Sequence, residues 1–62
     1  MKRAERTELQ ALLKRRGYSI GKVDGKIGSK TRRAIRHFQA SMGMIPDGHA
    51  GKYLLKGLRG AS

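Results

Sequence analysis

The stretch Asp24-Gly25-Lys26-Ile27-Gly28-Ser29-Lys30-Thr31 decides the fold of this chain. Asp24-Gly25 is a turn dipeptide, because an aspartate side chain bonds backbone two residues on and glycine tolerates positive φ. A helix follows at about Ser29, and Thr31 lies on its buried face. A buried hydroxyl needs a partner, so we expect Thr31 to bond backbone in the loop or in the preceding turn. The stretch therefore predicts a tight turn that leads into a helix.

A weaker copy of this stretch lies further along the chain. Asp47-Gly48-x-x-Gly51 repeats the spacing of Asp24-Gly25-x-x-Gly28, and Leu54 stands where the first copy has Thr31. Each copy precedes an apolar helical pattern. We therefore interpret the Asp and Gly residues of both copies chiefly as the architecture of a helix start.

Three amphipathic segments are arranged around these turns. Apolar residues at i, i+3 and i+4 spacing predict a helix over about residues 4–16, which Gly17 ends in a left-handed conformation. A second helix is predicted over about 29–42 and a third over about 50–59. Their apolar faces are formed by Leu9, Leu12 and Leu13, by Thr31, Ala34, Ile35, Phe38 and Met42, and by Leu54, Leu55 and Leu58.

The segment 18–28, between the first two helices, is rich in glycine. A long loop without structure is uncommon in so small a domain, so we expect this loop to be ordered. No segment alternates apolar and polar residues for long enough to predict a strand. The predicted fold is all-α, a small three-helix bundle with an ordered Gly-rich loop between helices 1 and 2, in a single domain over residues 1–62.

Composition narrows the class of protein. The chain has 62 residues and no cysteine, so its core is thin and has no disulfide or thiolate metal site. A net charge of +11 implies an anionic partner. Residues 1–6 are charged and no apolar segment follows, so no signal peptide is expected, and no run is long enough to span a bilayer. A role outside the cytoplasm would make this chain, expected to be a monomer, a piece of a longer secreted protein.

Taken together, these motifs resemble the peptidoglycan-binding-like domain family. The resemblance covers nearly the whole chain, because the ordered set and its spacings match although no single motif is specific. The resemblance implies a three-helix fold, no catalysis and attachment to bacterial cell-wall peptidoglycan. It assigns structural motif positions to Gln10, Gly17, Gly25, Gly28, Thr31, Phe38, Gln39, Asp47 and Gly48.

A narrower resemblance is to the C-terminal module of proteobacterial murein lytic transglycosylases. It rests on Arg3-Ala4-Glu5-Arg6 before Leu9-Gln10, on Lys30 to Ile35, and on the leucines after Asp47-Gly48. It implies a targeting domain of a wall-cleaving parent enzyme, located in the periplasm or extracellular envelope. The second copy departs from the family pattern at His49 and Leu54, so we expect the ligand groove beside the first loop.

Five residues are candidates for ligand contact, whether the ligand is the glycan strand or the stem peptide. Tyr18 opens the Gly-rich loop, where a rim aromatic suits sugar or peptide contact; ordinary core-edge packing is the alternative. Asp24 and Lys26 lie on that loop. Arg32 and Arg36 lie one turn apart on the outer face of the second helix, and arginine binds muropeptide carboxylates in a bidentate fork. The alternative for these arginines is an ordinary solvated surface.

This chain contains few candidate residues for catalysis or for binding a metal or a cofactor. Glu5 and Glu8 fit the electrostatics of a helix start better than a glycosidase pair, and no triad is available. His37 and His49 do not have metal-ligand spacing. We therefore expect no catalytic residue, no metal and no cofactor.

A basic nucleic-acid-binding domain is the alternative function. The second helix carries Lys30, Arg32, Arg33 and Arg36, which suits phosphate contact. It lacks Asn or Gln among those residues for reading bases, so no specific nucleic acid is expected. Sequence preference at physiological salt would favour this alternative. A third possibility, docking onto the parent enzyme alone, predicts no binding to cell walls.

Overall fold

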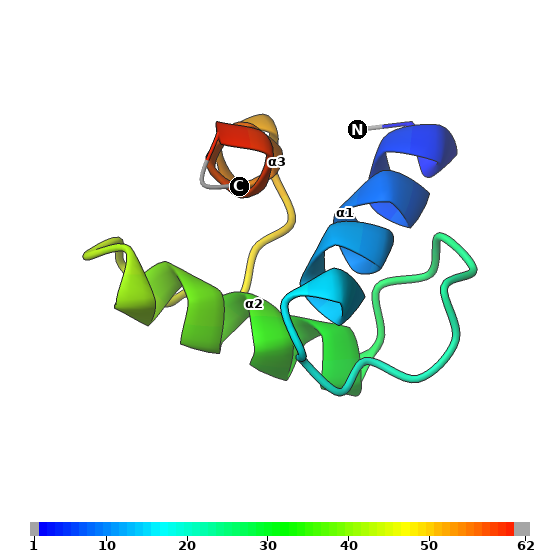
Figure 1. Cartoon of the computed structure of the whole chain (residues 1–62), viewed down its shortest axis with the longest axis horizontal. Coiled ribbons are helices and arrows are strands. Elements are labelled where there is room, and N and C mark those ends of the chain that lie inside the picture. The colour runs from blue at the N-terminus through cyan, green and yellow to red at the C-terminus, as the bar shows by residue number, and fades with distance from the viewer. Residues whose placement is uncertain (1, 61–62) are drawn as a thin grey trace.

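The computed structural model describes residues 2–60, which form three helices: α1 (Arg3–Arg15), α2 (Ser29–Ser41) and α3 (Lys52–Gly60). These bounds lie within two residues of the predicted ones, and the all-α three-helix fold is confirmed. α1 and α3 lie on the same side of α2 (Figure 1). No helix in the described range is long and apolar enough to cross a membrane. Met1 and residues 61–62, the ends of the predicted domain, lie outside the described residues.

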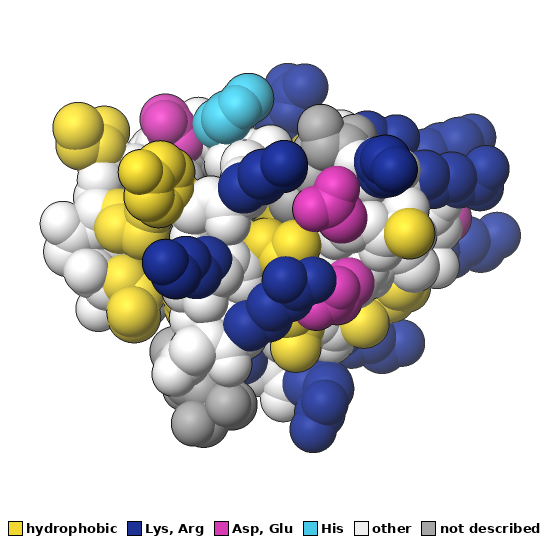
Figure 2. Space-filling model, turned by 90° about the horizontal axis from the view of Figure 1, so that it is seen from above, with side chains coloured by type: hydrophobic (Ala, Val, Ile, Leu, Met, Phe, Trp, Pro, Cys, Tyr) yellow, Lys and Arg dark blue, Asp and Glu magenta, His cyan; other side chains and the backbone are white. Residues whose placement is uncertain are grey.

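Charged and apolar side chains are unevenly distributed on the surface. On the face that α1 and α3 present, Lys and Arg side chains gather at the right-hand end of the view and extend across its middle (Figure 2). Hydrophobic side chains gather at the end of this face where α2 stops, with an acidic side chain and a histidine beside them. The molecule therefore offers a ligand a cationic surface and a separate apolar area.

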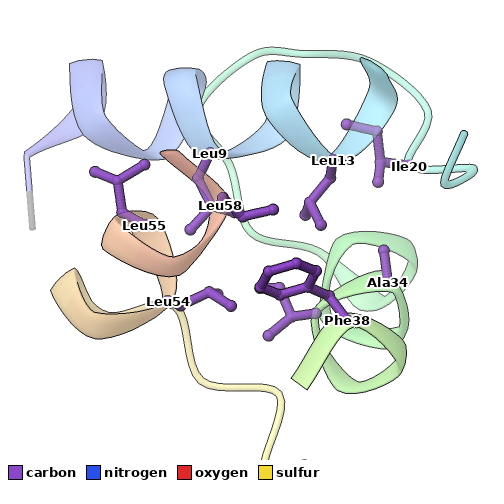
Figure 3. Close-up of a cluster of buried hydrophobic side chains, with 9 residues drawn as sticks. Leu9, Leu13, Ile20, Ala34, Phe38, Leu54, Leu55 and Leu58 are labelled. Atoms are coloured by element: carbon purple, nitrogen blue, oxygen red, sulfur yellow. The ribbon is translucent and has the colours of Figure 1, made fainter. Parts of the chain in front are cut away.

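The core lies where the three helices meet. Leu9 and Leu13 point from α1 into the space between α2 and α3, where they approach Phe38 and Leu58 (Figure 3). Each core side chain is at most 5% exposed, so its burial contributes the main stabilising free energy of the fold. The core consists of Leu9, Leu13, Ile20, Ala34, Ile35, Phe38, Leu54, Leu55 and Leu58.

Met42 does not belong to this core, contrary to the sequence prediction. Its side chain is 49% exposed, because Met42 is the C-cap of α2 and its backbone has already left the helical conformation, with φ −96° and ψ 4°. The buried face of α2 ends at Phe38 and Gln39.

Left-handed glycines end both of the first two helices. Gly17, with φ +92°, follows α1, and the next amide, that of Tyr18, bonds the carbonyl of Leu13 at 3.1 Å. Gly43, with φ +74°, ends α2 in the same way, and Met44 follows it. This hydrogen-bond pattern satisfies helix-terminal carbonyls and turns the chain sharply, as predicted for Gly17.

Two arginines tie α1 to the rest of the bundle. Arg59 of α3 forms a two-point fork with Glu8, with Nε to Oε2 and NH2 to Oε1 distances of 2.6 Å each. Arg16 lies over the ring of Phe38, 5.2 Å from its centroid. Arg16 also reaches the carbonyl of Leu58 at 3.4 Å. These two arginine side chains therefore stabilise the fold.

Candidate ligand-binding surface

Gln10 fixes the first Asp-Gly turn to α1. Its Oε1 accepts hydrogen bonds from the amides of Asp24 at 3.1 Å and Gly25 at 2.7 Å. Its Nε2 donates to the carbonyl of Lys26 at 2.8 Å. Gln10 is only 1% exposed, so these bonds are shielded from water and the turn is built directly on the helix.

Gln39 fixes the second Asp-Gly turn to α2. Its Oε1 accepts from the amide of Gly48 at 2.9 Å, and its Nε2 donates to Oδ1 of Asp47 at 2.9 Å. The two Asp-Gly copies are therefore structural equivalents, each held by a buried glutamine of the preceding helix. The signal for this role is present in the sequence, since each glutamine directly follows a core residue, in Leu9-Gln10 and Phe38-Gln39.

Thr31 has a different partner from the one predicted. Its hydroxyl oxygen accepts from Nε2 of Gln10 at 3.3 Å, so the partner is a side chain of α1 and no backbone group. The reason is that the Gln10 amide is already buried between the loop and the start of α2, within reach of the hydroxyl. The second copy has Leu54 here, and there the carboxylate of Asp47 takes up the glutamine Nε2 instead.

The two aspartates are turn residues, as predicted. Oδ1 of Asp24 accepts from the amide of Lys26 at 2.9 Å, and Oδ1 of Asp47 accepts from the amide of His49 at 2.8 Å. These backbone hydrogen bonds lower the pKa of each carboxyl group, since they favour its charged form. Both carboxylates are therefore ionised at neutral pH.

The two glutamates, Glu5 and Glu8, also accept hydrogen bonds that stabilise the fold. The backbone amide of Lys2 donates to Glu5 at 3.0 Å and lowers its pKa, and the bond to Arg59 lowers the pKa of Glu8. None of the four acids is held protonated for use as a general acid at neutral pH. Within residues 2–60, no group of three or more His, Asp or Glu side chains is placed to hold a metal ion.

Side chains of α1 cover the backbone of the first loop. Nε of Arg6 donates to the carbonyl of Gly25 at 2.9 Å, and Arg3 reaches the carbonyl of Asp24 at 3.4 Å. A Cβ on Gly25 would lie 2.8 Å from Cγ of Arg3 and 2.9 Å from Oγ1 of Thr7. The chain's own residues therefore occupy the outer backbone of this turn.

The second loop, residues 42–51, joins α2 to α3, and a groove of about 470 Å³ lies between this loop and the outer face of α2. Arg32 and Arg36 form its α2 wall, and Arg6 of α1 adds a third guanidinium group. Arg36 packs closely on the turn, since a Cβ on Gly48 would lie 3.2 Å from its Cγ. We call this the cationic groove. The main residues that line it are Arg6, Arg32, Arg36, Asp47, Gly48 and His49.

A second groove of about 460 Å³ lies on the other side of the same loop. Tyr53 and Ile45, which are 85% and 82% exposed, both line it. We call this the apolar groove; its main residues are Met44, Ile45, Asp47, His49, Lys52 and Tyr53. Asp47 and His49 line both grooves, so the two grooves adjoin at the second loop.

A third hollow of about 370 Å³ lies beside the first loop. Asp24 and Lys26 line this first-loop groove together with Lys22, Lys30 and the buried Thr31. It corresponds to the place where sequence analysis expects the ligand.

The five predicted ligand residues do not converge on a single site. Arg32 and Arg36 line the cationic groove, whereas Asp24 and Lys26 line the first-loop groove. Tyr18 is half-buried against the core and lines none of the three grooves. No pattern in the sequence predicts that the second loop lies against the arginine face of α2. The repeated Asp-Gly turn is the signal that marks that loop as a built element.

The fold and motifs define a known class of domain. Residues 2–58 match the family described as "Putative peptidoglycan binding domain". The chain belongs to this peptidoglycan-binding domain family, and the predicted resemblance is confirmed.

The individual relatives are longer proteins than this chain. The chain is 50% identical over 44 residues to two spore cortex-lytic enzymes of Bacillus cereus, covering 71% of this chain and 17% of each enzyme. It also matches SltB3 of Pseudomonas aeruginosa with a TM-score of 0.87 and 47% identity, over 92% of this chain and 15% of that chain. The SltB3 structures are complexes with NAG-anhNAM-pentapeptide and NAG-NAM-pentapeptide. This chain thus spans about a sixth of the length of these relatives.

Proposed function

We propose that this chain is a non-catalytic peptidoglycan-binding module that holds an attached wall-cleaving enzyme on murein. The observation that carries this proposal is the family match over residues 2–58. The relatives support it, since the same module is a small part of spore cortex-lytic enzymes and of SltB3. The narrower resemblance to lytic transglycosylases suggests that kind of parent enzyme. On this proposal the protein acts in the bacterial envelope as part of a longer secreted chain.

The cationic groove is the proposed contact with the stem peptide. Muropeptide carboxylates are anionic, and Arg32 and Arg36 stand one turn apart along the wall of the groove. A guanidinium group binds a carboxylate through two parallel N–H···O bonds, which adds orientation to simple attraction. The net charge of +11 also steers the chain toward an anionic polymer. Asp24 and Lys26, in the first-loop groove, remain a proposed second contact, as does Tyr18.

The lack of free acid chemistry supports a binding role. A glycosidase needs one carboxyl group that stays protonated near neutral pH beside one that is ionised. Here all four acidic pKa values are lowered by hydrogen bonds that hold turns, a helix start or an ion pair. These groups are used for structure, so the proposal assigns cleavage to the parent enzyme.

Sedimentation with purified sacculi tests this function. The wild-type chain is expected to pellet with sacculi at moderate salt, and Arg32→Gln/Arg36→Gln is expected to weaken binding about tenfold by removing a bidentate contact. Lys14→Gln/Arg15→Gln is the matched control, because it removes the same charge at exposed positions that line none of the grooves.

Two results would count against the proposal. A wild-type chain that stays in the supernatant would overturn wall binding itself. Equal loss in the two double variants would show that charge alone, and no groove, attracts the wall. Random duplex DNA serves as a further comparison, since uniform weak binding that falls steeply with salt is expected from charge alone.

A further inference from the structure

The side chain of Tyr53 lies on the surface, and its ring does not contribute to the hydrophobic core. It lies in the first turn of α3 and is 85% exposed, while the next two residues, Leu54 and Leu55, are buried in the core. Single exposed apolar side chains are common on proteins. Tyr53 is not single, because Ile45, 82% exposed, lines the same groove from the second loop. The two side chains together give this hollow an apolar surface that a ligand of matching chemistry can cover.

Polar groups stand at the edge of this apolar surface. Asp47, His49 and Lys52 line the groove together with Tyr53. The carboxylate of Asp47 accepts hydrogen bonds from Gln39 and from the amide of His49, both at Oδ1. The groove therefore combines an aromatic face with hydrogen-bonding groups at its rim.

A pyranose ring matches this combination. One face of the ring carries C–H groups that pack on an aromatic face, and its edges carry hydroxyl and acetamido groups that hydrogen-bond. Tyrosine suits such contact because its ring is rigid and loses little conformational entropy on binding. A free carboxylate or phosphate, in contrast, would be better placed among the guanidinium groups of the neighbouring cationic groove.

The closeness of the two grooves gives the sugar a position relative to the peptide. Asp47 and His49 line both grooves, so a ligand part in one groove lies next to a ligand part in the other. Peptidoglycan has both required parts, since each glycan strand carries stem peptides. We propose that one sugar ring of the glycan strand stacks on Tyr53 in the apolar groove while a stem-peptide carboxylate binds in the cationic groove.

This inference rests on the proposed wall-binding function and adds a sugar contact at the second loop, next to the proposed peptide contact. The first turn has little free backbone to offer, because Gln10, Arg3 and Arg6 already bond its amides and carbonyls. The second turn leaves the apolar side of its loop uncovered by the chain, as Ile45 and Tyr53 show.

The test separates sugar from peptide with two probes. The 62-residue chain is titrated with glycan strands from which the peptides have been removed, and separately with the free stem pentapeptide. Tyr53→Ala is expected to weaken binding of the bare strands about fivefold or more and to change peptide binding by less than about twofold. Arg32→Gln/Arg36→Gln is expected to show the opposite pattern. Tyr53→Trp, which keeps an aromatic face, is expected to retain strand binding.

Salt gives an independent readout. Stacking is insensitive to ionic screening, so the part of strand binding that depends on Tyr53 is expected to persist at about 0.5 M NaCl. Because Tyr53 is so exposed, Tyr53→Ala is expected to fold like the wild type, and a melting curve confirms this.

Each contrary outcome identifies what has failed. Equal binding of bare strands by the wild type and Tyr53→Ala overturns the sugar site and leaves wall binding intact. A dimer that Tyr53→Ala dissociates, with unchanged strand affinity, overturns it in favour of a second copy of the chain. Tyr53-dependent association with the parent catalytic domain alone overturns it in favour of docking. No binding of intact sacculi by the wild type overturns the proposed function itself.

Discussion

Two buried glutamines define the turns of this domain. A buried amide side chain is costly unless its donors and acceptors are paired, and Gln10 and Gln39 satisfy this requirement by bonding the Asp-Gly turns. The residues that the family resemblance marks as motif positions are therefore chiefly architectural. On the proposed function, ligand contact falls to side chains that lie beside these turns.

Replacing these glutamines with leucine is expected to destabilise the fold unequally. Gln10→Leu leaves the buried amide of Gly25 and the amide of Asp24 without their acceptor, at about 2–4 kcal/mol. Gln39→Leu removes the acceptor of one amide, that of Gly48, and is expected to lower the free energy of unfolding by about 1–2 kcal/mol. Urea unfolding measures both values. A loss below about 0.5 kcal/mol for Gln10→Leu, the scatter of surface substitutions, would contradict this role.

Two glycine-to-alanine changes are expected to have opposite signs. Gly57 lies inside α3, and an added Cβ would make ordinary contact with Phe38 at 3.7 Å, so Gly57→Ala is expected to stabilise by about 0.5–1 kcal/mol. Gly25 has φ +82° and a Cβ there would meet Arg3 at 2.8 Å, so Gly25→Ala is expected to destabilise by more than about 1 kcal/mol. Melting temperatures check both, and the same sign for the two variants would refute the assignment.

At the scale of elements, the sequence predicts local structure well and long-range pairing poorly. Helix bounds, the left-handed Gly17 and the Asp turns depend on neighbours along the chain, and their patterns are readable. The partner of Thr31 and the fork of Glu8 with Arg59 join residues 21 and 51 positions apart. Such pairs depend on how helices pack, which periodicity does not specify. The same limit explains why the second loop was not placed beside Arg32 and Arg36.

The turns themselves are expected to resist hydrogen exchange. The amides of Gly25 and Gly48 donate to the buried glutamines, so they should exchange slowly, close to the rate of global unfolding. The amide of Lys22 is the internal control, because it makes no hydrogen bond within residues 2–60 and should exchange fast. Fast exchange at Gly25 would mean that the Gly-rich loop is not the ordered element that the sequence predicts.

At the scale of the whole molecule, the charge balance makes stability depend on acid pH. Hydrogen bonds lower the pKa of Asp24 and Asp47 below the ordinary value of 3.8, and of Glu5 and Glu8 below 4.5. A carboxyl group whose pKa is lowered in the folded state contributes stability that is present above its unfolded pKa. That contribution is lost as pH falls through the lowered values.

The melting temperature is therefore expected to be flat from about pH 5 to pH 7 and to fall below about pH 4. Protonation of the acids also removes the negative charge that offsets 15 Lys and Arg side chains, so self-repulsion adds to the fall. Thermal unfolding followed by circular dichroism across this range measures it. A melting temperature that rises on acidification would contradict the assigned roles of these acids.

On the proposed function and the further inference, peptidoglycan binds around the second loop, in the cationic and apolar grooves. Chemical-shift mapping of the chain with a soluble muropeptide, disaccharide and stem peptide together, is the sharpest test of this placement. Shifts are expected at Arg32, Arg36, His49 and Tyr53, and they should saturate together. Shifts confined to Tyr18, Asp24 and Lys26 would place the ligand at the first loop, and no shifts at millimolar muropeptide would deny binding altogether.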